Sequence, residues 1–350
     1  MIMTDTDRSS LSVILPNYNH GRFLGRQLEA LATQSVAPLE ILVIDDASTD
    51  DSLKVAEEAA TRYSCIRILR NEQNAGTLKS VARGLNEAQG AFLLFAAADD
   101  CVLPGLIEKS LALLGRHPDA GVCTALVREI DEAGKDLGIR ASLRALEAPG
   151  YIPPETALKK LYLHDAWFQC YTGVYRRAVF DDLGGFDPGL ESFADSFLCT
   201  VMALRGGVCF IPEPLASVRI FTDSYSMAMT SNVTRVLRMF GHARDLMENA
   251  YADLFPSDLV DLWDRRWRYT ISSNLVRAGE TDRAKLETLM PRAGMLDKFV
   301  LRLLMSLGPA RKRLVPLYLL FRLTPGDLVS TLRRRLFHRG PASAGGNRGV

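Results

Sequence analysis

Short, largely apolar runs alternate with longer amphipathic segments along the first part of the chain. The runs are four or five residues long, which is typical of buried strands. The longer segments repeat their apolar residues at helical spacing. This alternation predicts βαβ units, and therefore an α/β fold with a largely parallel sheet flanked by helices. The predicted strands are 11–15, 40–44, 66–69 and 91–95, and the predicted helices are about 22–34, 51–63 and 77–88.

The pattern becomes mainly helical after about residue 225. The most apolar stretch there, Leu314–Phe321, is too short to span a bilayer, and the basic triplet Arg311–Arg313 prevents its extension. The predicted helices of this region are 233–251, 258–278, 282–289 and 298–307. The predicted parts of the chain are an α/β domain over 1–225, a mainly α-helical region over 226–339 and a disordered tail over 340–350.

Two pairs of acids follow predicted strands. Asp45 and Asp46 come after the second strand, and Asp99 and Asp100 come after the fourth, behind three alanines. The carboxyl ends of parallel strands meet at the edge where ligands bind, and hard divalent cations share carboxylate and phosphate oxygens. The pattern predicts a divalent-metal site for a phosphorylated ligand, with solvated turns or helix caps as the competing interpretation. We expect Pro104 to open the next helix at its first position.

Several classes of protein do not fit these residues. No Gly-x-Gly-x-x-Gly follows a strand and no Walker-type glycine loop occurs, which argues against a dinucleotide-binding domain and a P-loop. The six cysteines form no Cys-x-x-Cys pair, and the five histidines share no metal-ligand spacing. We therefore expect a reducing compartment without structural zinc or a disulfide framework. The N-terminus resembles no secretory signal, so we expect a cytoplasmic protein.

Charge is distributed unevenly along the chain. The segment Lys298–Val350 carries eleven Lys or Arg residues and one acid, a charge of +10, which leaves −9 on residues 1–297. Apolar residues are interleaved with these bases, so we expect peripheral contact of 298–339 with anionic lipid at the inner face of the membrane. The alternative is that these helices pack on the rest of the chain or on a second copy in a homo-oligomer. Nucleic acid is not expected, because the acidic body would oppose it.

Eight motifs occur in order along residues 10–225. They are Pro16-Asn-Tyr-Asn19, the run from Glu40 to Asp50, Asn74-Ala-Gly76, the run from Ala88 to Phe95, Asp99-Asp100 with Pro104, Gly184-Gly-Phe-Asp187, Phe193-Ala-Asp195 and Ile211-Pro-Glu-Pro-Leu215. With these motifs, residues 10–225 resemble the family 2 glycosyltransferases of the GT-A fold, which have a Rossmann-like mixed sheet. This resemblance implies a nucleotide-sugar donor, Mn²⁺ or Mg²⁺, and transfer with inversion at the anomeric carbon. It would make 1–225 the catalytic domain.

The resemblance also implies roles for single residues in donor binding. Tyr18 would lie near the base, and Asp46 would read the base edge or the ribose; capping of the following helix is the alternative for Asp46. Lys79 and Arg83 would lie near the diphosphate, with solvated helix charges as the alternative. The residues assigned to the nucleotide sugar are Pro16, Tyr18, Asn19, Asp46, Lys79, Arg83, Asp99 and Arg219.

The resemblance makes Asp100 the metal ligand, with Asp99 as its neighbour at the ribose or the metal. Many relatives carry a further acid at Ala97 or Ala98, and its loss should weaken metal binding. Where many relatives read Arg-x-His, this chain has Arg219-Ile-Phe221. Phe221 therefore takes no ligand role, while Arg219 is expected to meet the phosphates.

Asp195 matches the catalytic base of the family and is expected in a turn before a helix over 196–204. It would remove the acceptor proton as the hydroxyl attacks C1 of the sugar. Capping of that helix is the alternative. Relatives often carry an acid where this chain has Ala194. Trp167, Phe168 and Tyr171 would form either an aromatic floor for an acceptor sugar or part of the core.

The resemblance thus implies an inverting glycosyltransferase that moves a sugar from a nucleotide-diphosphate-sugar to a glycan or lipid-linked acceptor, and we expect it to act in bacterial surface polysaccharide synthesis. The Gln-x-x-Arg-Trp motif of processive relatives is absent, so we expect transfer of one or a few residues. A nucleotidyltransferase that forms nucleotide sugars is one alternative, although its glycine-rich loop does not follow the first strand. The other is a non-catalytic binding relative, which the alanines at acid positions motivate.

Overall fold

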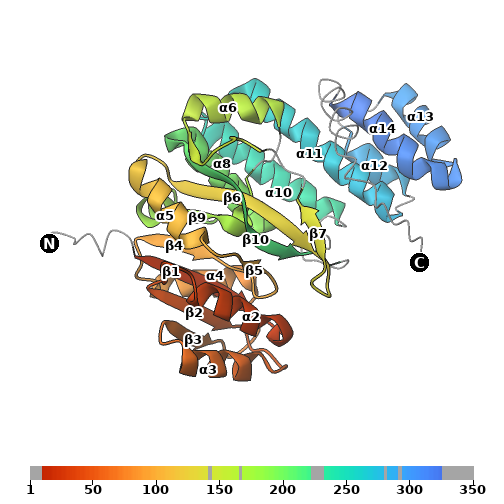
Figure 1. The fold of residues 1–350 in the computed structure, drawn as a ribbon. Coiled ribbons are helices and arrows are strands. Elements are labelled where there is room, and N and C mark those ends of the chain that lie inside the picture. Colours follow the sequence, from red (N-terminus) through yellow and green to blue (C-terminus); the bar gives the residue numbers. More distant parts are fainter. Residues whose placement is uncertain are drawn as a thin grey trace, which may run out of the picture. The chain divides into compact units, whose positions relative to one another are not determined.

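The structure is a computed structural model that describes residues 10–140, 144–164, 168–221, 232–279, 282–290 and 294–324. Contacts divide the chain into two compact units, one of residues 1–228 and 238–254 and one of residues 229–237 and 255–350. Figure 1 labels their helices and strands. The predictions for Trp167 and for the tail 340–350 lie outside the described residues.

The strands all belong to the first unit. They are β1 (Leu11–Asn17), β2 (Glu40–Asp45), β3 (Ile66–Arg70), β4 (Phe92–Phe95), β5 (Cys101–Val102), β6 (Val122–Ile130), β7 (Asp136–Ile139), β8 (Gly150–Ile152), β9 (Val174–Arg176) and β10 (Val208–Arg219). The helices of this unit up to β10 are α2 (Gly21–Ala32), α3 (Ser52–Arg62), α4 (Thr77–Glu87), α5 (Leu106–Arg116), α6 (Pro154–Leu163), α7 (Arg177–Asp182) and α8 (Ala194–Gly206), with short 3₁₀ turns η1 (Cys170–Thr172) and η2 (Pro188–Phe193).

The strands form one mixed sheet in the order β3-β2-β1-β4-β9-β6-β10-β5, with β7 beside β6 and β8 beside β10. The first four strands of this order pair in parallel, as the alternating pattern predicts. Antiparallel pairing begins where β9 lies between β4 and β6. Because β2 and β4 both flank β1, the turns that follow these three strands lie at one edge of the sheet.

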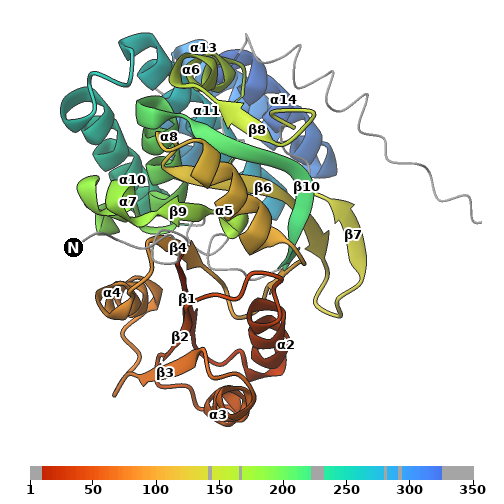
Figure 2. The ribbon, with the colours of Figure 1, turned by 60° about the vertical axis from the view of Figure 1, so that its left-hand side comes forward.

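Helices cover both faces of the parallel part of the sheet, which explains why β1 and β2 are buried on both sides. On one face, Val13 joins the apolar cluster that includes Leu28 of α2. On the other face α4 approaches closely through Gly84, where a Cβ atom would lie 2.7 Å from Ile14 and 2.8 Å from Ile44. Figure 2 shows α2 and α4 on opposite sides of these strands.

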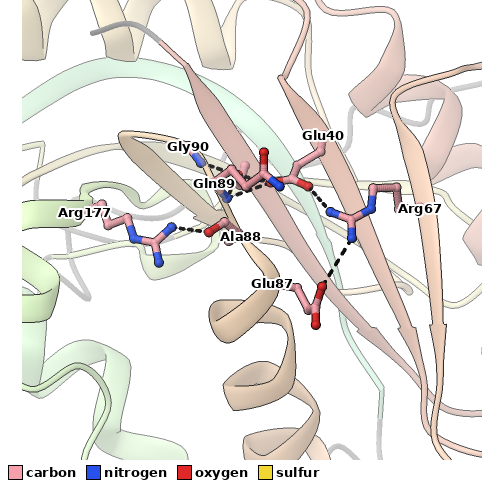
Figure 3. A network of polar contacts seen from close by, with 8 residues as sticks. Glu40, Arg67, Glu87, Ala88, Gln89, Gly90 and Arg177 are labelled. Carbon is pink, nitrogen blue, oxygen red and sulfur yellow. Dashed lines mark hydrogen bonds and ion pairs between the residues drawn. The ribbon is translucent and has the colours of Figure 1, made fainter. Parts of the chain in front are cut away.

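A polar network links the amino ends of β1, β2 and β4, at the edge of the sheet away from Asp46 and Asp100 (Figure 3). Glu40 is 5% exposed, and its Oε1 accepts hydrogen bonds from Ser12 Oγ at 2.8 Å and from Gln89 N at 2.8 Å. Its Oε2 pairs with Arg67 Nη1 at 2.6 Å. Gly90 lies so close to β1 that a Cβ atom would stand 2.5 Å from Ser12 N. The buried carboxylate is therefore fully partnered, as burial of a charge requires.

The helix expected to begin at Pro104 begins two residues later, so that prediction was wrong. The stretch before it pairs with β10, where Leu103 N donates to Leu215 O at 2.9 Å. The chain must turn after this pairing, and Gly105 does so with φ of +88°, a value that glycine adopts without strain. Pro104 therefore lies in the turn, and α5 starts at Leu106.

The second unit is helical, as predicted for the C-terminal region. Helix α10 (Val233–Asp245) starts in it and continues into the π-helical turn η3 (Leu246–Ala250) of the first unit. The other helices are α11 (Ser257–Ala278), α12 (Arg283–Thr288), α13 (Met295–Met305) and α14 (Arg311–Leu323), with a 3₁₀ turn η4 (Gly308–Ala310). Among the described residues, none of the helices is both long and apolar enough to cross a bilayer.

Candidate functional site

The Asp99–Asp100 turn is held from two sides. From α2, Gln27 donates through Nε2 to Ala97 O at 3.1 Å and accepts from Val102 N at 3.0 Å, although 70 or more residues separate them in sequence. Gln27 is 1% exposed. A buried amide that satisfies backbone groups on both sides of a turn fixes the turn's shape. Sequence reasoning missed Gln27, because a glutamine on an amphipathic helix gives no signal of this contact.

Arg219, at the end of β10, holds the same turn from the other side. Its backbone N–H donates to Asp100 Oδ1 at 2.9 Å, and its Nε donates to Asp99 O at 3.1 Å. Its Nη1 donates to the carbonyl oxygens of Asp131 and Glu132, each at 2.9 Å. The residue is 8% exposed, and its guanidinium lies 4.2 Å from the centre of the Phe23 ring. These contacts position the acids; the expected phosphate contact stays a prediction.

The carboxyl group of Asp100 is poorly stabilised as an anion. Burial and the neighbouring charge of Asp99 raise its pKa to about 7, against the lowering effect of the Arg219 N–H. Its Oδ1 is occupied by that N–H, which leaves Oδ2 toward a further ligand. A bound cation would offset both the cost of burying a negative charge at Asp100 and the repulsion between the two carboxylates.

These residues fit the expected divalent metal. Mg²⁺ is commonly bound through one or two carboxylates, with phosphates of the substrate and waters completing its shell. Asp100 and Asp99 supply that number. Within the described ranges, no three Asp, Glu, His or Cys side chains gather closely enough to bind an ion. A cation bound by these two carboxylates would need phosphate or water oxygens to complete its shell.

Asp46, at the end of β2, is already saturated with donors. Its Oδ1 accepts from Asn71 Nδ2 at 2.6 Å and Ala75 N at 2.9 Å, and its Oδ2 accepts from Gly76 N at 2.8 Å. Burial raises its pKa, but these hydrogen bonds outweigh burial, and the pKa lies below the usual value. The carboxylate thus fixes the Asn74-Ala-Gly76 motif at the start of α4. Asp46 does not cap the next helix: the N-cap position of α3 is Asp51, and Asp50 accepts from Ser52 N, the first residue of that helix, at 3.0 Å.

The loops after β1 and β2 are bound to each other. Asn19 donates its backbone N–H to Ser48 Oγ at 3.0 Å, and its Oδ1 accepts from Thr49 N at 2.8 Å. Asn19 has φ of 56° and Ala47 has φ of 60°, values that non-glycine residues rarely adopt. Tyr18 begins the loop after β1 and is 42% exposed. Strain of this kind is held by surrounding contacts and is often found at functional sites.

The remaining predicted donor residues differ in their partners. Pro16 is the sixth residue of β1 and is partly buried. Arg83 is exposed, and its Nη1 donates to Arg70 O at 2.7 Å and Asn71 Oδ1 at 2.5 Å. It therefore supports the residue that contacts Asp46. Lys79 lies one turn earlier on α4 and is exposed, which agrees with either of its two interpretations.

Asp195 lies in the first turn of α8 and not in a turn before the helix, because α8 already begins at Ala194. Phe193 occupies the capping position. Asp195 Oδ1 accepts from Ser196 N at 2.6 Å. Burial raises the pKa of Asp195, against the lowering effects of the Ser196 N–H and of Cys170. A partly desolvated carboxylate is a stronger base than an ordinary surface aspartate.

Tyr171 lies in the short turn η1. Thr172 fastens this turn to β6 by accepting from Ala125 N at 2.8 Å. Burial of the phenol raises the pKa of Tyr171, and the charges of Asp100 and Asp195 raise it further against the lowering effect of Arg140. Tyr171 is 41% exposed, whereas Phe168 is buried in the core. A role of Tyr171 as part of an acceptor floor stays a prediction.

Arg140 is a second residue that sequence reasoning missed. It follows β7, and its guanidinium lies 5.5 Å from the centre of the Tyr171 ring. Its charge lowers the pKa of Asp100 against the stronger effects of burial and of Asp99. Its Nε is 3.6 Å from Glu129 Oε1. An arginine after a weakly patterned hairpin gives no sequence signal, because the β6–β7 pairing brings it to the site.

The Gly184-Gly-Phe-Asp187 motif anchors the segment before Asp195. Asp187 accepts from Gly189 N at 2.7 Å and contacts His242 Nε2 of α10 at 2.9 Å. Glu191, between this anchor and α8, has φ of 48°. The contacts of Asp187 therefore fix the start of the segment that leads into α8, where Asp195 lies.

Comparison with known proteins identifies the family of this chain. A family model described as glycosyl transferase family 2 matches residues 12–184. An uncharacterized glycosyltransferase of Haemophilus influenzae is 32% identical over 227 residues, which cover 64% of this chain and 73% of the relative. The uncharacterized glycosyltransferase YibD of Escherichia coli is 33% identical over 183 residues, 51% of each chain, so this chain spans about half the length of that relative.

A solved structure shows likeness of fold. The mannosyltransferase PcManGT of Pyrobaculum calidifontis, in complex with GDP-Man and Mn²⁺, superimposes with a TM-score of 0.54 at 16% identity, covering 91% of this chain and 86% of that one. This likeness of fold and the sequence matches together identify the class of protein. The chain belongs to glycosyl transferase family 2, has a GT-A-like fold and is a glycosyltransferase.

Proposed function

We propose that this glycosyltransferase transfers with inversion, from a nucleoside-diphosphate sugar to a hydroxyl group of a glycan or lipid-linked acceptor in bacterial surface polysaccharide synthesis. The observation that supports the proposal is a pair of carboxyl groups with raised pKa values: Asp100, in the turn that Gln27 and Arg219 hold, and Asp195, in the first turn of α8. The two come from distant parts of the chain, after β4 and at the start of α8. Asp100 is proposed to bind a cation, and Asp195 is proposed to accept a proton.

In the proposed reaction, Asp195 takes the proton of the acceptor hydroxyl while the acceptor oxygen forms a bond to C1 of the sugar. The bond from C1 to the donor phosphate breaks at the same time, and the nucleoside diphosphate leaves with the electron pair. Asp100, with Asp99 beside it, would hold Mn²⁺ or Mg²⁺, which supplies charge neutralisation of the diphosphate when bound. Arg140 would face the same negative charge from the β7 side.

The donor nucleotide is proposed to lie over the loops after β1 and β2, with Tyr18 against the base. The exposure of Tyr18 and the strained backbone at Asn19 and Ala47 support this placement. The GDP-Man and Mn²⁺ in the Pyrobaculum mannosyltransferase support a nucleotide sugar and a divalent metal for this chain as well. Because Asp46 already accepts three hydrogen bonds, we propose that it acts mainly by shaping the pocket.

The test is a screen of nucleoside diphosphates by thermal shift, with and without Mn²⁺, because a ligand of the folded state raises its melting temperature. The best nucleotide then defines the donors for an assay of product. Release of a nucleoside diphosphate that requires the metal supports transfer. Formation of pyrophosphate from a nucleoside triphosphate and a sugar phosphate would identify a nucleotidyltransferase. Binding without turnover of any matching donor, in the presence of glycan and lipid-linked acceptors, would identify a non-catalytic relative.

A further inference from the structure

Helix α13 presents an apolar stripe to solvent. Leu296, Phe299 and Leu303 follow one another at spacings of three or four residues, which places them along one face of the helix, and Leu307 follows just after its end. Their exposed fractions are 73%, 64%, 55% and 42%. The opposite face contains the fully buried Leu301. Exposed apolar surface of this extent, unlike scattered single residues, marks an interaction site.

Helix α14 repeats the pattern. Leu314, Leu317 and Phe321 are 38%, 46% and 63% exposed and share one side of the helix. Leu319 and Val315 are fully buried on the other side. The two helices belong to the same unit and pack against each other. They therefore use one apolar side for the fold and leave a second one uncovered.

The uncovered surface is cationic. Residues 294–324 contain six Lys or Arg residues and a single acid, Asp297. Asp297 is 6% exposed and accepts from Arg322 Nε at 2.8 Å and from Tyr318 Oη at 2.5 Å. The hydrogen bond from Arg322 is the main cause that lowers its pKa to about 2. The negative charge of Asp297 is thus balanced by Arg322 inside the unit, whereas bases such as Lys298 and Arg302 are exposed.

We propose that α13 and α14 form a docking surface for a bilayer that contains anionic phospholipid. The exposed Leu and Phe side chains would enter the boundary between head groups and acyl chains, as in helices that lie in the interface plane. The bases beside them would meet the negative head groups. A second copy of the chain fits less well, because a symmetric contact through this surface would oppose bases to bases without an exposed acid in 294–324.

The test is co-sedimentation of the full chain with vesicles, without donor or acceptor, so that its result is independent of the proposed reaction. Vesicles of phosphatidylglycerol and phosphatidylcholine in equal parts are compared with phosphatidylcholine alone. We expect binding to the anionic vesicles, weakened by salt. The double variant Phe299→Glu with Leu303→Glu should bind about 100-fold more weakly or worse, since two apolar side chains no longer insert. The control is Leu163→Glu, which changes a residue 63% exposed on α6 and should leave binding unchanged.

Charge is tested separately. The variant Lys298→Gln with Arg302→Gln should bind anionic vesicles about 30-fold more weakly, because each base near such a surface contributes about 1 kcal/mol. Its control is Lys54→Gln with Lys135→Gln, which removes two exposed bases of the first unit. Circular dichroism checks that every variant is folded. All changed positions are exposed, so the fold should persist.

Three results would overturn the proposal. Equal vesicle binding by the parent and by the Phe299→Glu, Leu303→Glu variant would exclude this surface. Loss of binding on neutralising Arg333, Arg334 and Arg335 to Gln, with no loss for Lys298→Gln and Arg302→Gln, would transfer the role to the segment after α14. Absence of vesicle binding, with sedimentation velocity showing that the glutamate variant turns a dimer into a monomer, would make the surface a contact between copies.

Discussion

Asp46 and Asp100 each follow a strand that flanks β1, yet their surroundings differ. Asp46 receives three hydrogen bonds from neighbouring groups, and its pKa is lowered although the side chain is 3% exposed. Asp100 receives one backbone N–H and faces Asp99, and its pKa rises to about 7. Burial is the largest single effect on the pKa of both acids, and they differ in whether hydrogen bonds outweigh it. The first acid maintains a loop, and the second is suited to receive a cation.

Asp195 extends this comparison to the acceptor side. It has donors, but burial outweighs them, and its pKa is raised. The candidate site therefore joins one saturated carboxylate with two carboxylates whose charge is poorly compensated. The variants below test this division, from the largest expected effect to the smallest.

The largest effect is expected for Asp195→Asn. The change keeps the shape of the side chain and removes the proton acceptor, so the rate of transfer should fall by about 10²–10⁴-fold. Affinity for the donor nucleotide, measured by calorimetry, should not change. Asp182→Asn, an exposed carboxylate near the same region, is the control. Transfer at the parental rate by Asp195→Asn would mean that the base lies elsewhere.

The pH profile gives an independent check on the same residue. The base must be ionised, so kcat/KM at saturating metal should rise as the pH increases through the pKa of Asp195. Because that pKa is raised, the rise should occur above 3.8, the ordinary value for an aspartate. In Asp195→Asn the residual rate should lose this dependence. A profile that is the same in both proteins would contradict the assignment.

The next largest effect is expected for Asp100→Asn. The amide oxygen can still accept from Arg219 N, but the charge that attracts a cation is gone. Affinity for the nucleotide in the presence of Mn²⁺ should fall on the order of 100-fold, because loss even of residues that only support a metal ligand costs 10–100-fold. Affinity without metal should stay the same. Asp99→Asn, which changes the neighbour, should have a smaller effect. Equal metal-dependent affinity in Asp100→Asn and the parent would exclude Asp100 as the ligand.

Asp46→Asn should act on stability before activity. The NH2 group of the new amide would oppose either the N–H of Gly76 or that of Ala75, whichever the amide oxygen does not accept from, and an unsatisfied buried group costs about 1–3 kcal/mol. Denaturant unfolding should show that loss. Asp51→Asn, an exposed acid in the next turn, should show none. A variant as stable as the parent but unable to bind nucleotide would restore the direct contact with base or ribose.

Much of this arrangement could be predicted from the sequence because it depends on local patterns. Short apolar runs indicated the strands, and the acid pairs after them indicated the edge of the sheet where the candidate site lies. The contacts that give each acid its character join residues far apart in the chain. Gln27 acts on a turn 70 residues away, and Arg140 reaches the site through the β6–β7 hairpin. Such partners follow from the packing of the sheet and leave no periodicity in the sequence.

The position of Pro104 illustrates the same limit. Proline favours the first turn of a helix, and that preference is real. The hydrogen bond from Leu103 to Leu215 of β10 nevertheless extends the strand-like segment as far as Leu103, the residue before Pro104. The chain then needs the left-handed turn at Gly105, and the helix starts after it. Pairing with a strand more than a hundred residues later thus displaced a local signal by two positions.

The smallest effect, and the sharpest test of positioning, is expected for Gln27→Leu. Leucine has a similar volume, but it leaves Ala97 O and Val102 N without their partner on both sides of the acid pair. The turn should loosen, and metal-dependent affinity for the nucleotide should fall about 10-fold, in line with one or two lost hydrogen bonds. Gln34→Leu is the matched control. Gln34 lies just after α2 and is also buried. Its Nε2 donates to Leu103 O at 3.1 Å, three residues after Asp100. Both variants should lose stability, but only Gln27→Leu should lose metal-dependent affinity. An equal loss of affinity in both would mean that general loosening of the first unit, and not the shape of the acid turn, controls binding.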